Sequence, residues 1–380
     1  MFQIIKNDKF DNFFKNVLFC SYFSYQFFLV ISVSEIARSF DRLYTLLSAV
    51  IILSFLMIIL CDAYYFFRGF YNFYEIAICF IVGILLAISL YNYRNVMVIA
   101  NIFAILAFKK NDAIKALKYY IIATTTAFII IILIGIFTEY NGNVVQIRYS
   151  VERIRYGLGF YYVSVPPFYY FNIVLAYFVV YKNINLLQYF AIVLINLVLF
   201  LLTDTKAPFL YTLLAIMLHI VVTKSNSIII DKLFGFFTVI SYPFFFLLSL
   251  VLSMFYDGNN PIFRIINSIL TGRLVLTHNA IRLLPISLFG QDIGVYSSEK
   301  NYYIDSSFLS MLYNNGIVVL IISIVFMAYF CYLAYKKNKK SLMLALFLLA
   351  ARASFDFGFM ALQLSPFVIL FLPTLYEKNS

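Results

Sequence analysis

Long apolar runs separated by short clusters of charge make up almost the whole chain. A helix needs about 20 mostly apolar residues to cross a bilayer, and the charged interruptions leave segments of about that length. The pattern predicts an all-α, polytopic membrane bundle forming one transmembrane domain over residues 1–380. Because 96–108 is short and the last two segments can form a re-entrant pair, we expect ten to twelve spans, near 17–34, 43–61, 71–91, 96–108, 119–138, 160–181, 186–203, 207–223, 233–255, 307–335, 341–354 and 357–376.

Composition agrees with a membrane bundle and excludes a water-soluble globular domain. Only 12% of the residues are charged and 64% are hydrophobic, whereas soluble domains carry roughly a quarter charged residues. Lys6, Lys9 and Lys15 precede the first apolar run, which has no small-residue cleavage site, so the first helix is expected to remain as an anchor. The net charge of +11 is spread in clusters between apolar runs, which predicts topology signals rather than a nucleic-acid partner.

Nothing in the sequence indicates a metal or cofactor site. The four cysteines are isolated and lie in apolar surroundings, so neither a disulfide framework nor a zinc site is expected. The sequence has no HExxH, Walker A, GxSxG or Rossmann glycine motif. Carboxylates in the long loops are few and isolated, so no acid pair is expected to hold a divalent cation against a diphosphate.

Lysines and arginines are sorted along the chain. An N-terminus in the cytoplasm places the lysine clusters at 109–118, 224–232 and 336–340 inside, in agreement with the positive-inside rule. Both termini are then cytoplasmic. All lysines except Lys206 and Lys300 lie inside, and all arginines except Arg68 lie outside.

External arginines need a reason other than topology. The guanidinium group binds phosphate or carboxylate with two parallel hydrogen bonds and stays charged in partly buried sites. We therefore expect an anionic ligand on the external face. The alternative is that these arginines contact lipid headgroups or pair with Glu35, Asp41 and Glu152, and for Arg38, Arg42 and Arg94 this alternative is favoured.

Two loops are long, and both are predicted to be external. The first, 139–159, carries Arg148, Arg153 and Arg155 before a Gly-Leu-Gly segment. Pro166 and Pro167 interrupt the following span, and the backbone groups that they free must face protein or a water-filled cavity. An arginine cluster beside a broken helix predicts the wall of a cavity.

The second long loop, 256–306, contains an amphipathic stretch from 262 to 284 that is expected to lie in short helices along the membrane surface. With Thr271 as N-cap, a helix would place His278 and Arg282 on one face. Arg273 and Arg282 are nine residues apart and roughly half a turn out of phase, so they are not expected to bind one phosphate together.

Four segments carry a family resemblance. With about twelve spans and a long external loop, the chain resembles the O-antigen and capsule polysaccharide polymerases of the Wzy type. The segments are Thr271-Gly272-Arg273, Leu288-Phe289-Gly290-Gln291-Asp292-Ile293-Gly294, Asp305-Ser306-Ser307-Phe308-Leu309 and Leu312-Tyr313-Asn314-Asn315-Gly316-Ile317. Arg155-Tyr156-Gly157-Leu158-Gly159-Phe160 is similar to the family's arginine and Gly-Phe pattern before a span, and Lys206 stands where relatives often carry an arginine.

The resemblance implies a glycosyltransferase at the external leaflet of the bacterial plasma membrane. It would transfer a growing glycan from undecaprenyl diphosphate to the next lipid-linked repeat unit, among membrane lipids and with a flippase and a chain-length regulator as partners. A base would assist the acceptor hydroxyl, with Asp305 and His278 as candidates. The candidate diphosphate or substrate ligands are Arg273, Arg155, Arg153, Arg148, Arg282 and Lys206.

Each candidate also has a structural interpretation. Arg273 can form an ion pair, Asp305 can cap the next helix, His278 can be a solvated loop residue, and Lys206 can mark the interface. Arg352 and Asp356, at i and i+4, are expected to pair with each other.

Three other functions stay open. An O-antigen ligase has similar chemistry but typically carries a histidine near the position of Asp305. A lipid-linked oligosaccharide flippase or other transporter should show internal repeats and charges within its spans. A membrane scaffold without catalysis is the third.

Overall fold

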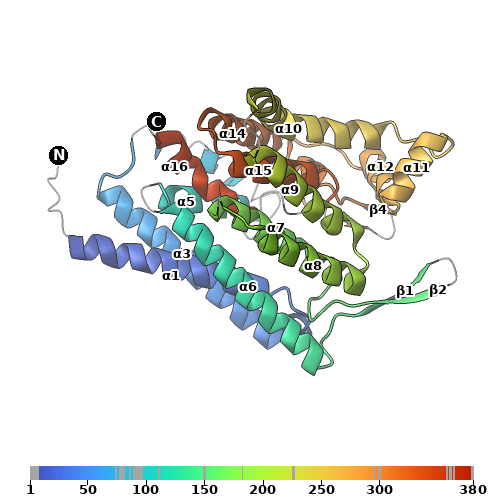
Figure 1. The fold of residues 1–380 in the computed structure, drawn as a ribbon, viewed down its shortest axis with the longest axis horizontal. Coiled ribbons are helices and arrows are strands. Elements are labelled where there is room, and N and C mark those ends of the chain that lie inside the picture. The colour runs from blue at the N-terminus through green and yellow to red at the C-terminus, as the bar shows by residue number, and fades with distance from the viewer. Residues whose placement is uncertain are drawn as a thin grey trace. The chain divides into compact units, whose positions relative to one another are not determined.

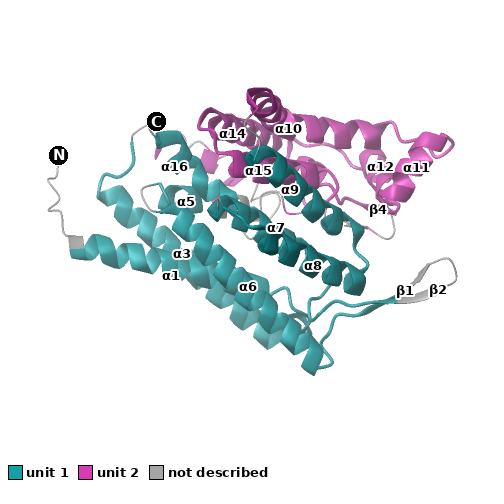
Figure 2. Ribbon diagram, in the orientation of Figure 1, with its two compact units in different colours: residues 1–72, 103–224, 362–378 teal, residues 73–102, 225–361, 379–380 magenta. Residues whose placement is uncertain are grey.

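The protein is described by a computed structural model covering residues 8–72, 75–76, 82–84, 87–88, 97–109, 112–148, 151–181, 183–224, 227–293, 296–297, 301–356, 358, 362 and 364–377. Helices dominate these residues (Figure 1). Contacts divide the chain into two compact units (Figure 2). Unit 1 comprises residues 1–72, 103–224 and 362–378, and unit 2 comprises 73–102, 225–361 and 379–380.

Unit 1 contains three helices that pack on one another and, later in the chain, a second group of packed helices. Helix α1 packs against α3 and α6, α6 packs against α7 and η1, and α7 packs against α8 and α9. Helix α5 (Met97–Ala107) is shared between the two units. The other helices of unit 1 are α1 (Asp8–Ile31), α2 (Glu35–Ser39), α3 (Asp41–Phe67), α6 (Ala113–Phe137), α7 (Val165–Val180), α8 (Leu186–Thr203), α9 (Lys206–Lys224), the 3₁₀ helix η1 (Pro366–Leu370) and α16 (Phe371–Tyr376).

Polar residues between the apolar runs fix where several of these helices begin. The Asp112 carboxylate accepts the backbone N–H of Lys115 at 2.8 Å and caps α6. Asn185 and Gln188 form a reciprocal capping box at the start of α8. Each cap satisfies backbone donors that have no partner within the helix.

The first long loop contains an antiparallel hairpin, β1 (Val144–Arg148) and β2 (Val151–Arg155). After it, the chain passes close to α6 and α2. The carbonyl of Gly159 accepts the backbone N–H of Glu35 at 2.8 Å. A Cβ at Gly159, which has φ +82°, would collide with the Ile131 carbonyl. Glycine is therefore required where the loop crosses α6.

Unit 2 is centred on α10, which packs against α12, α13, α14 and α15. A short two-stranded ribbon, β3 with β4, precedes α13, and β4 packs against α12. The elements of unit 2 are α10 (Ile228–Met254), α11 (Pro261–Ile269), α12 (Arg273–Leu283), β3 (Tyr296–Ser297), β4 (Tyr302–Tyr303), α13 (Ser307–Asn314), α14 (Ile317–Lys336) and α15 (Lys340–Ala353).

The protein is a multi-pass helical membrane protein. Among the described residues, seven helices are long and apolar enough to cross a bilayer, namely α1, α3, α6, α8, α9, α10 and α14. Helix α7 and the segment Pro366–Tyr376 are shorter apolar helices. The expected span at 71–91 lies largely outside the described residues, and the count of ten to twelve stays a prediction.

One element expected to be continuous is broken, and one expected helix start is displaced by a residue. The expected span 307–335 is interrupted at Asn315 and Gly316, where Gly316 has φ +89°. The amphipathic stretch 262–284 is interrupted at Thr271 and Gly272. The prediction of Thr271 as the N-cap was wrong, because Gly272 occupies that position.

Candidate functional site

Arg273 is placed by a tight corner between α11 and α12. Thr271 and Gly272 both have left-handed backbone angles, with φ of 55° and 85°. The carbonyl of Asn267 accepts the backbone N–H of Gly272 at 2.8 Å, and its side-chain oxygen accepts that of Val275 at 3.2 Å. Gly272 has no side chain to cap α12, so Asn267 supplies the cap from the preceding helix. Arg273 therefore begins α12 in a fixed position.

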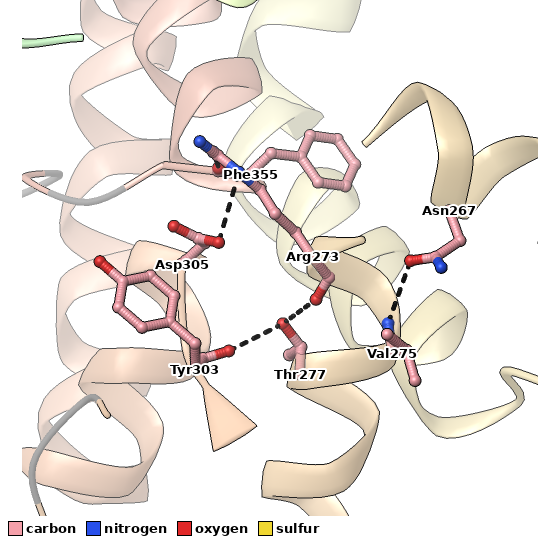
Figure 3. A network of polar contacts seen from close by, with 7 residues as sticks. All are labelled: Asn267, Arg273, Val275, Thr277, Tyr303, Asp305 and Phe355. Atoms are coloured by element: carbon pink, nitrogen blue, oxygen red, sulfur yellow. Dashed lines mark hydrogen bonds and ion pairs between the residues drawn. The ribbon is translucent and has the colours of Figure 1, made fainter. Parts of the chain in front are cut away.

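Among the described residues the guanidinium of Arg273 has two partners, which Figure 3 shows in close-up. Its Nε atom lies 3.3 Å from Oδ2 of Asp305, and Nη1 donates to the carbonyl of Phe355 at 2.7 Å. The Arg273 side chain is 33% exposed and that of Asp305 only 11%. The structure thus brings together two residues that are 32 positions apart in the sequence and that were selected for different chemical roles.

The end of α15 holds the Asp305 segment in place. The Ser306 hydroxyl donates to the carbonyl of Ala353 at 3.3 Å, and both the backbone N–H and the hydroxyl of Ser307 donate to the carbonyl of Asp356. Ser306 also caps α13, so the alternative that Asp305 is the cap was wrong. The predicted pair of Arg352 and Asp356 is confirmed, with Nε 2.9 Å from Oδ2.

Two of the segments that carry the family resemblance pack directly on each other. The carbonyls of Ser287 and Leu288 accept the N–H groups of Ile317 and Val318 at 3.1 and 3.2 Å. These bonds satisfy donors at the start of α14 and explain why the expected span 307–335 is broken there. A Cβ at Gly290 would collide with the carbonyl of Asn314, so this turn also requires glycine.

A small recess opens beside Arg273 and Asp305. Its volume is about 10 Å³, enough for about one water molecule. Five hydroxyl side chains contribute to its lining, Ser249, Ser253, Thr277, Ser306 and Ser354, together with the apolar Leu270, Leu274 and Phe355. Four of these hydroxyls donate to backbone carbonyls, so the partly exposed guanidinium of Arg273 at the edge of the recess is the group suited to an anionic ligand.

Burial changes the acidity of Asp305. Desolvation raises the pKa of this carboxyl to about 6, the nearby Arg273 guanidinium opposes the rise, and the carboxylate of Asp356 adds to it. A carboxylate with a pKa of about 6 is ionised at neutral pH and binds a proton more readily than an ordinary aspartate.

His278 lies next to the recess but does not line it. Its Nδ1 atom is 2.8 Å from the carbonyl of Ser253, and because a carbonyl only accepts, Nδ1 carries the proton. In this tautomer Nε2 is the ring nitrogen that can accept. Arg282 is exposed in the last turn of α12, half a turn out of phase with Arg273.

In unit 1, Arg155 is bonded to the connection between α8 and α9. Nε donates to the carbonyl of Thr203 at 2.8 Å, and Nη2 donates to the carbonyl of Asp204 at 3.3 Å and to the hydroxyl of Thr205 at 3.2 Å. The guanidinium thereby satisfies carbonyls at the end of α8. The next residue, Lys206, is exposed at the start of α9.

The other two candidate arginines lie on the hairpin. Arg148 pairs with Val151 and Arg153 with Gln146 in the register of β1 and β2. Alternate positions of an antiparallel pair share a face, so positions 148, 153 and 155 lie on one face. The side chains of Arg148 and Arg153 fall outside the described part of the structure.

Several residues of the recess were not among the sequence candidates. Ser249 and Ser253 lie four positions apart within the apolar helix α10, a spacing that places two hydroxyls on one face and that could have indicated a polar recess. Ser354 and the carbonyl of Phe355 carried no such signal, because their contribution depends on how α15 ends.

No protein-family model, curated protein or solved structure matches the chain.

Proposed function

We propose that the protein is a membrane glycosyltransferase that polymerises lipid-linked oligosaccharide repeat units on the external face of the bacterial plasma membrane. The observation that carries the proposal is the Arg273–Asp305 pair above a recess lined by five hydroxyl side chains. This pair lies in segments that resemble the Wzy-type polymerases, namely 271–273 and 305–309.

The surroundings of Arg273 suit a lipid-linked substrate. Helix α11 exposes Ile262, Ile265 and Ile269, which are 65%, 61% and 73% exposed and lie on one helical face. An exposed apolar stripe on a short helix is typical of a helix that lies in the membrane interface. Arg273 follows this helix after a three-residue turn, 270–272, and the diphosphate of a lipid carrier occupies the same interfacial depth.

Arg273 has the donors needed to stabilise a diphosphate leaving group. A guanidinium carries five N–H groups, and the contacts with Asp305 and Phe355 use Nε and one N–H of Nη1. Three N–H groups then remain for phosphate oxygens. Their hydrogen bonds strengthen as negative charge develops on the leaving group, which lowers the barrier to transfer.

Asp305 acts as the general base in this mechanism. The acceptor hydroxyl oxygen attacks the anomeric carbon of the growing glycan, and the bond from that carbon to the diphosphate oxygen breaks. Undecaprenyl diphosphate leaves with the electron pair, and the hydroxyl proton passes to Asp305. Binding of the diphosphate to Arg273 weakens the ion pair and increases the proton affinity of the carboxylate. His278, through Nε2, is the second candidate base.

Phenotypes of the surface glycan test the proposal. Cells carrying Arg273→Ala, with the protein level confirmed by blot, should display single repeat units, because flipping and ligation continue without polymerisation. Arg264→Ala, at an exposed position of α11, is the matched control and should retain long chains. Full-length polymer from Arg273→Ala would contradict the proposal. Long chains held on the carrier would instead indicate a ligase, and absence of repeat units outside would indicate a flippase.

The proposal includes an orientation, with both termini in the cytoplasm and the loops 139–159 and 256–306 outside. A single cysteine replacing Glu139, which is exposed after α6, should react with an impermeant maleimide in intact cells. A cysteine replacing Lys336, exposed at the end of α14, should not react. The opposite labelling pattern would invert the orientation and remove the external site.

A further inference from the structure

The end of α15, residues 353–356, bonds to both halves of the proposed site. Its carbonyls accept hydrogen bonds from Ser306, Arg273 and Ser307, in that order along the turn, at 3.3, 2.7 and 3.2 Å. Arg273 lies on α12, whereas the two serines directly follow Asp305. A shift of this turn would therefore displace the guanidinium and the carboxylate of the site together.

Side-chain contacts fix the turn, which continues past the last residue of α15. The Ser354 hydroxyl donates to the carbonyl of Phe245 in α10 at 3.2 Å. Arg352, in the last turn of α15, forms an ion pair with Asp356, with Nε 2.9 Å from Oδ2. Residues past the end of a helix lack its regular hydrogen bonds, so this ion pair connects the turn to the helix.

Both partners of the ion pair are buried, with side chains that are 4% and 6% exposed. Neither residue lines the recess beside Arg273. Burying two charges carries a desolvation cost, and apolar residues of similar volume are often as stabilising. A buried ion pair directly behind the site therefore indicates a role in addition to stability.

The charge of the pair also acts on Asp305. The Asp356 carboxylate adds to the rise in the pKa of Asp305 that burial causes, and Arg273 opposes this rise. Because Arg352 pairs with Asp356, it limits the effect of that carboxylate. In the described part of the structure, the charged or titratable side chains at or beside the recess include Arg273 and His278 on α12, Tyr303 in β4, and Arg352 and Asp356 at the end of α15.

We infer that Arg352 is a positioning residue of the transferase, which holds Asp356 so that the turn keeps Arg273 and Asp305 in place. This inference rests on the proposed function. Arg352 acts through the carbonyls of residues 353–356 and through the charge of Asp356. The fixed turn keeps the guanidinium at the diphosphate and the carboxylate within reach of the acceptor hydroxyl.

The rate of polymerisation of purified lipid-linked repeat units, measured against pH, tests the inference. Arg352→Gln should lower the rate at pH 8 about tenfold through lost positioning. It should also move the acid limb of the profile to higher pH, because Asp356 loses its guanidinium partner. Asp356→Asn should move the limb to lower pH. The double variant should return the limb to near its wild-type position and recover part of the rate, since Gln and Asn at i, i+4 can form a hydrogen bond.

The matched control is Lys340→Gln, which breaks an ion pair with Asp231 of 2.7 Å at the opposite end of α15. Its rate and acid limb should match those of wild type. If the folded molecules of all three site variants transfer at the wild-type rate with an unmoved limb, the pair has only a structural role and the inference is overturned. Should Arg352→Gln fail to fold, an unmoved limb in both Asp356→Asn and the double variant would overturn it equally.

A measurement without substrate separates this inference from the proposed function. The pH at which the unfolding temperatures with and without Asp305→Asn diverge reports the titration of Asp305. This pH should rise in the Arg352→Gln background and fall in the Asp356→Asn background. Both shifts in a protein that transfers no glycan would contradict the proposed function and support the arrangement around Asp305. Transfer without either shift would overturn the role of Arg352 alone.

Discussion

Arg155 in unit 1 and Arg273 in unit 2 were selected by the same sequence argument, and the structure gives them different surroundings. Arg155 donates to two backbone carbonyls and one hydroxyl, all within the turn that joins α8 to α9. Arg273 has a carboxylate as its charged partner and lies beside a recess lined by hydroxyls. Carbonyls at the end of a helix are fixed, whereas a carboxylate on a loop can be replaced by another anion. From the kind of acceptor we predict a structural role for Arg155 and ligand binding for Arg273.

The largest expected effect concerns the rate of transfer. Arg273→Lys keeps the charge but loses the planar arrangement of donors. Loss of such a contact raises the barrier by about 2–4 kcal/mol, on the order of a 30- to 1000-fold decrease in rate. The measurement is polymerisation of purified lipid-linked repeat units by wild-type and variant protein. Arg264→Lys is the matched control, and a variant Arg273→Lys as fast as this control would remove Arg273 from the mechanism.

For Arg155 the expected effect is on stability. Arg155→Ala leaves carbonyls at the end of α8 without their charged donor, which costs about 2–3 kcal/mol of folding free energy. Thermal unfolding in detergent and proteolysis between α8 and α9 should both show the loss. The rate per folded molecule should stay near that of wild type. A stable variant with a large loss of rate would reverse the comparison and assign Arg155 to the substrate.

A smaller effect is expected from pH. With a pKa of about 6, Asp305 is about 90% protonated at pH 5, so the rate should fall about tenfold between pH 7 and pH 5. If Asp305 is the base, His278→Gln should keep this dependence of the rate on pH. If His278 is the base, His278→Gln should lose it.

Ionisation of Asp305 is expected to raise the rate of transfer but to lower the stability of the fold. Its folded-state pKa is raised above the ordinary value of 3.8, so its stabilising contribution is full below pH 3.8 and is lost as pH rises through about 6. Asp305→Asn should therefore flatten the dependence of the unfolding temperature on pH between 4 and 7, while greatly lowering the rate.

Apolar patterning predicted the helical membrane bundle, because each span depends on its own local composition. The i, i+4 spacing of Arg352 and Asp356 predicted their ion pair, which is confirmed. The helix start after Thr271 was predicted and lies one residue further on, whereas the break at Gly316 was not predicted. That break depends on partners distant in sequence, the Ser287 and Leu288 carbonyls that accept from the start of α14. Local periodicity contains no information about such contacts.

The candidate site shows the same limit. The sequence selected Arg273 and Asp305 separately, and their contact arises because the end of α15 holds the segment that contains Asp305. The clamp formed by Arg155 was missed, since a guanidinium that binds backbone carbonyls leaves no signature in the residue types around it. The distribution of lysine and arginine identified the predicted external arginines as unusual. Which groups each arginine contacts depends on the fold.

The smallest expected effect tests how the corner before α12 positions Arg273. Asn267→Ala removes the side-chain cap of Val275 and should cost about 1 kcal/mol of stability, the usual value of a helix cap. Asn260→Ala removes the equivalent cap of α11, where the side chain accepts from Ile262 at 2.9 Å, and should cost a similar amount. The two variants therefore match in stability and differ in position. Only Asn267→Ala loosens the first turn of α12, so only this variant should lower the rate of transfer, by several-fold, because small displacements of a positioned group reduce its contribution to the transition state. Equal rates for the two variants would mean that Arg273 is held mainly by Asp305 and Phe355, and the α11–α12 corner would then have no part in catalysis.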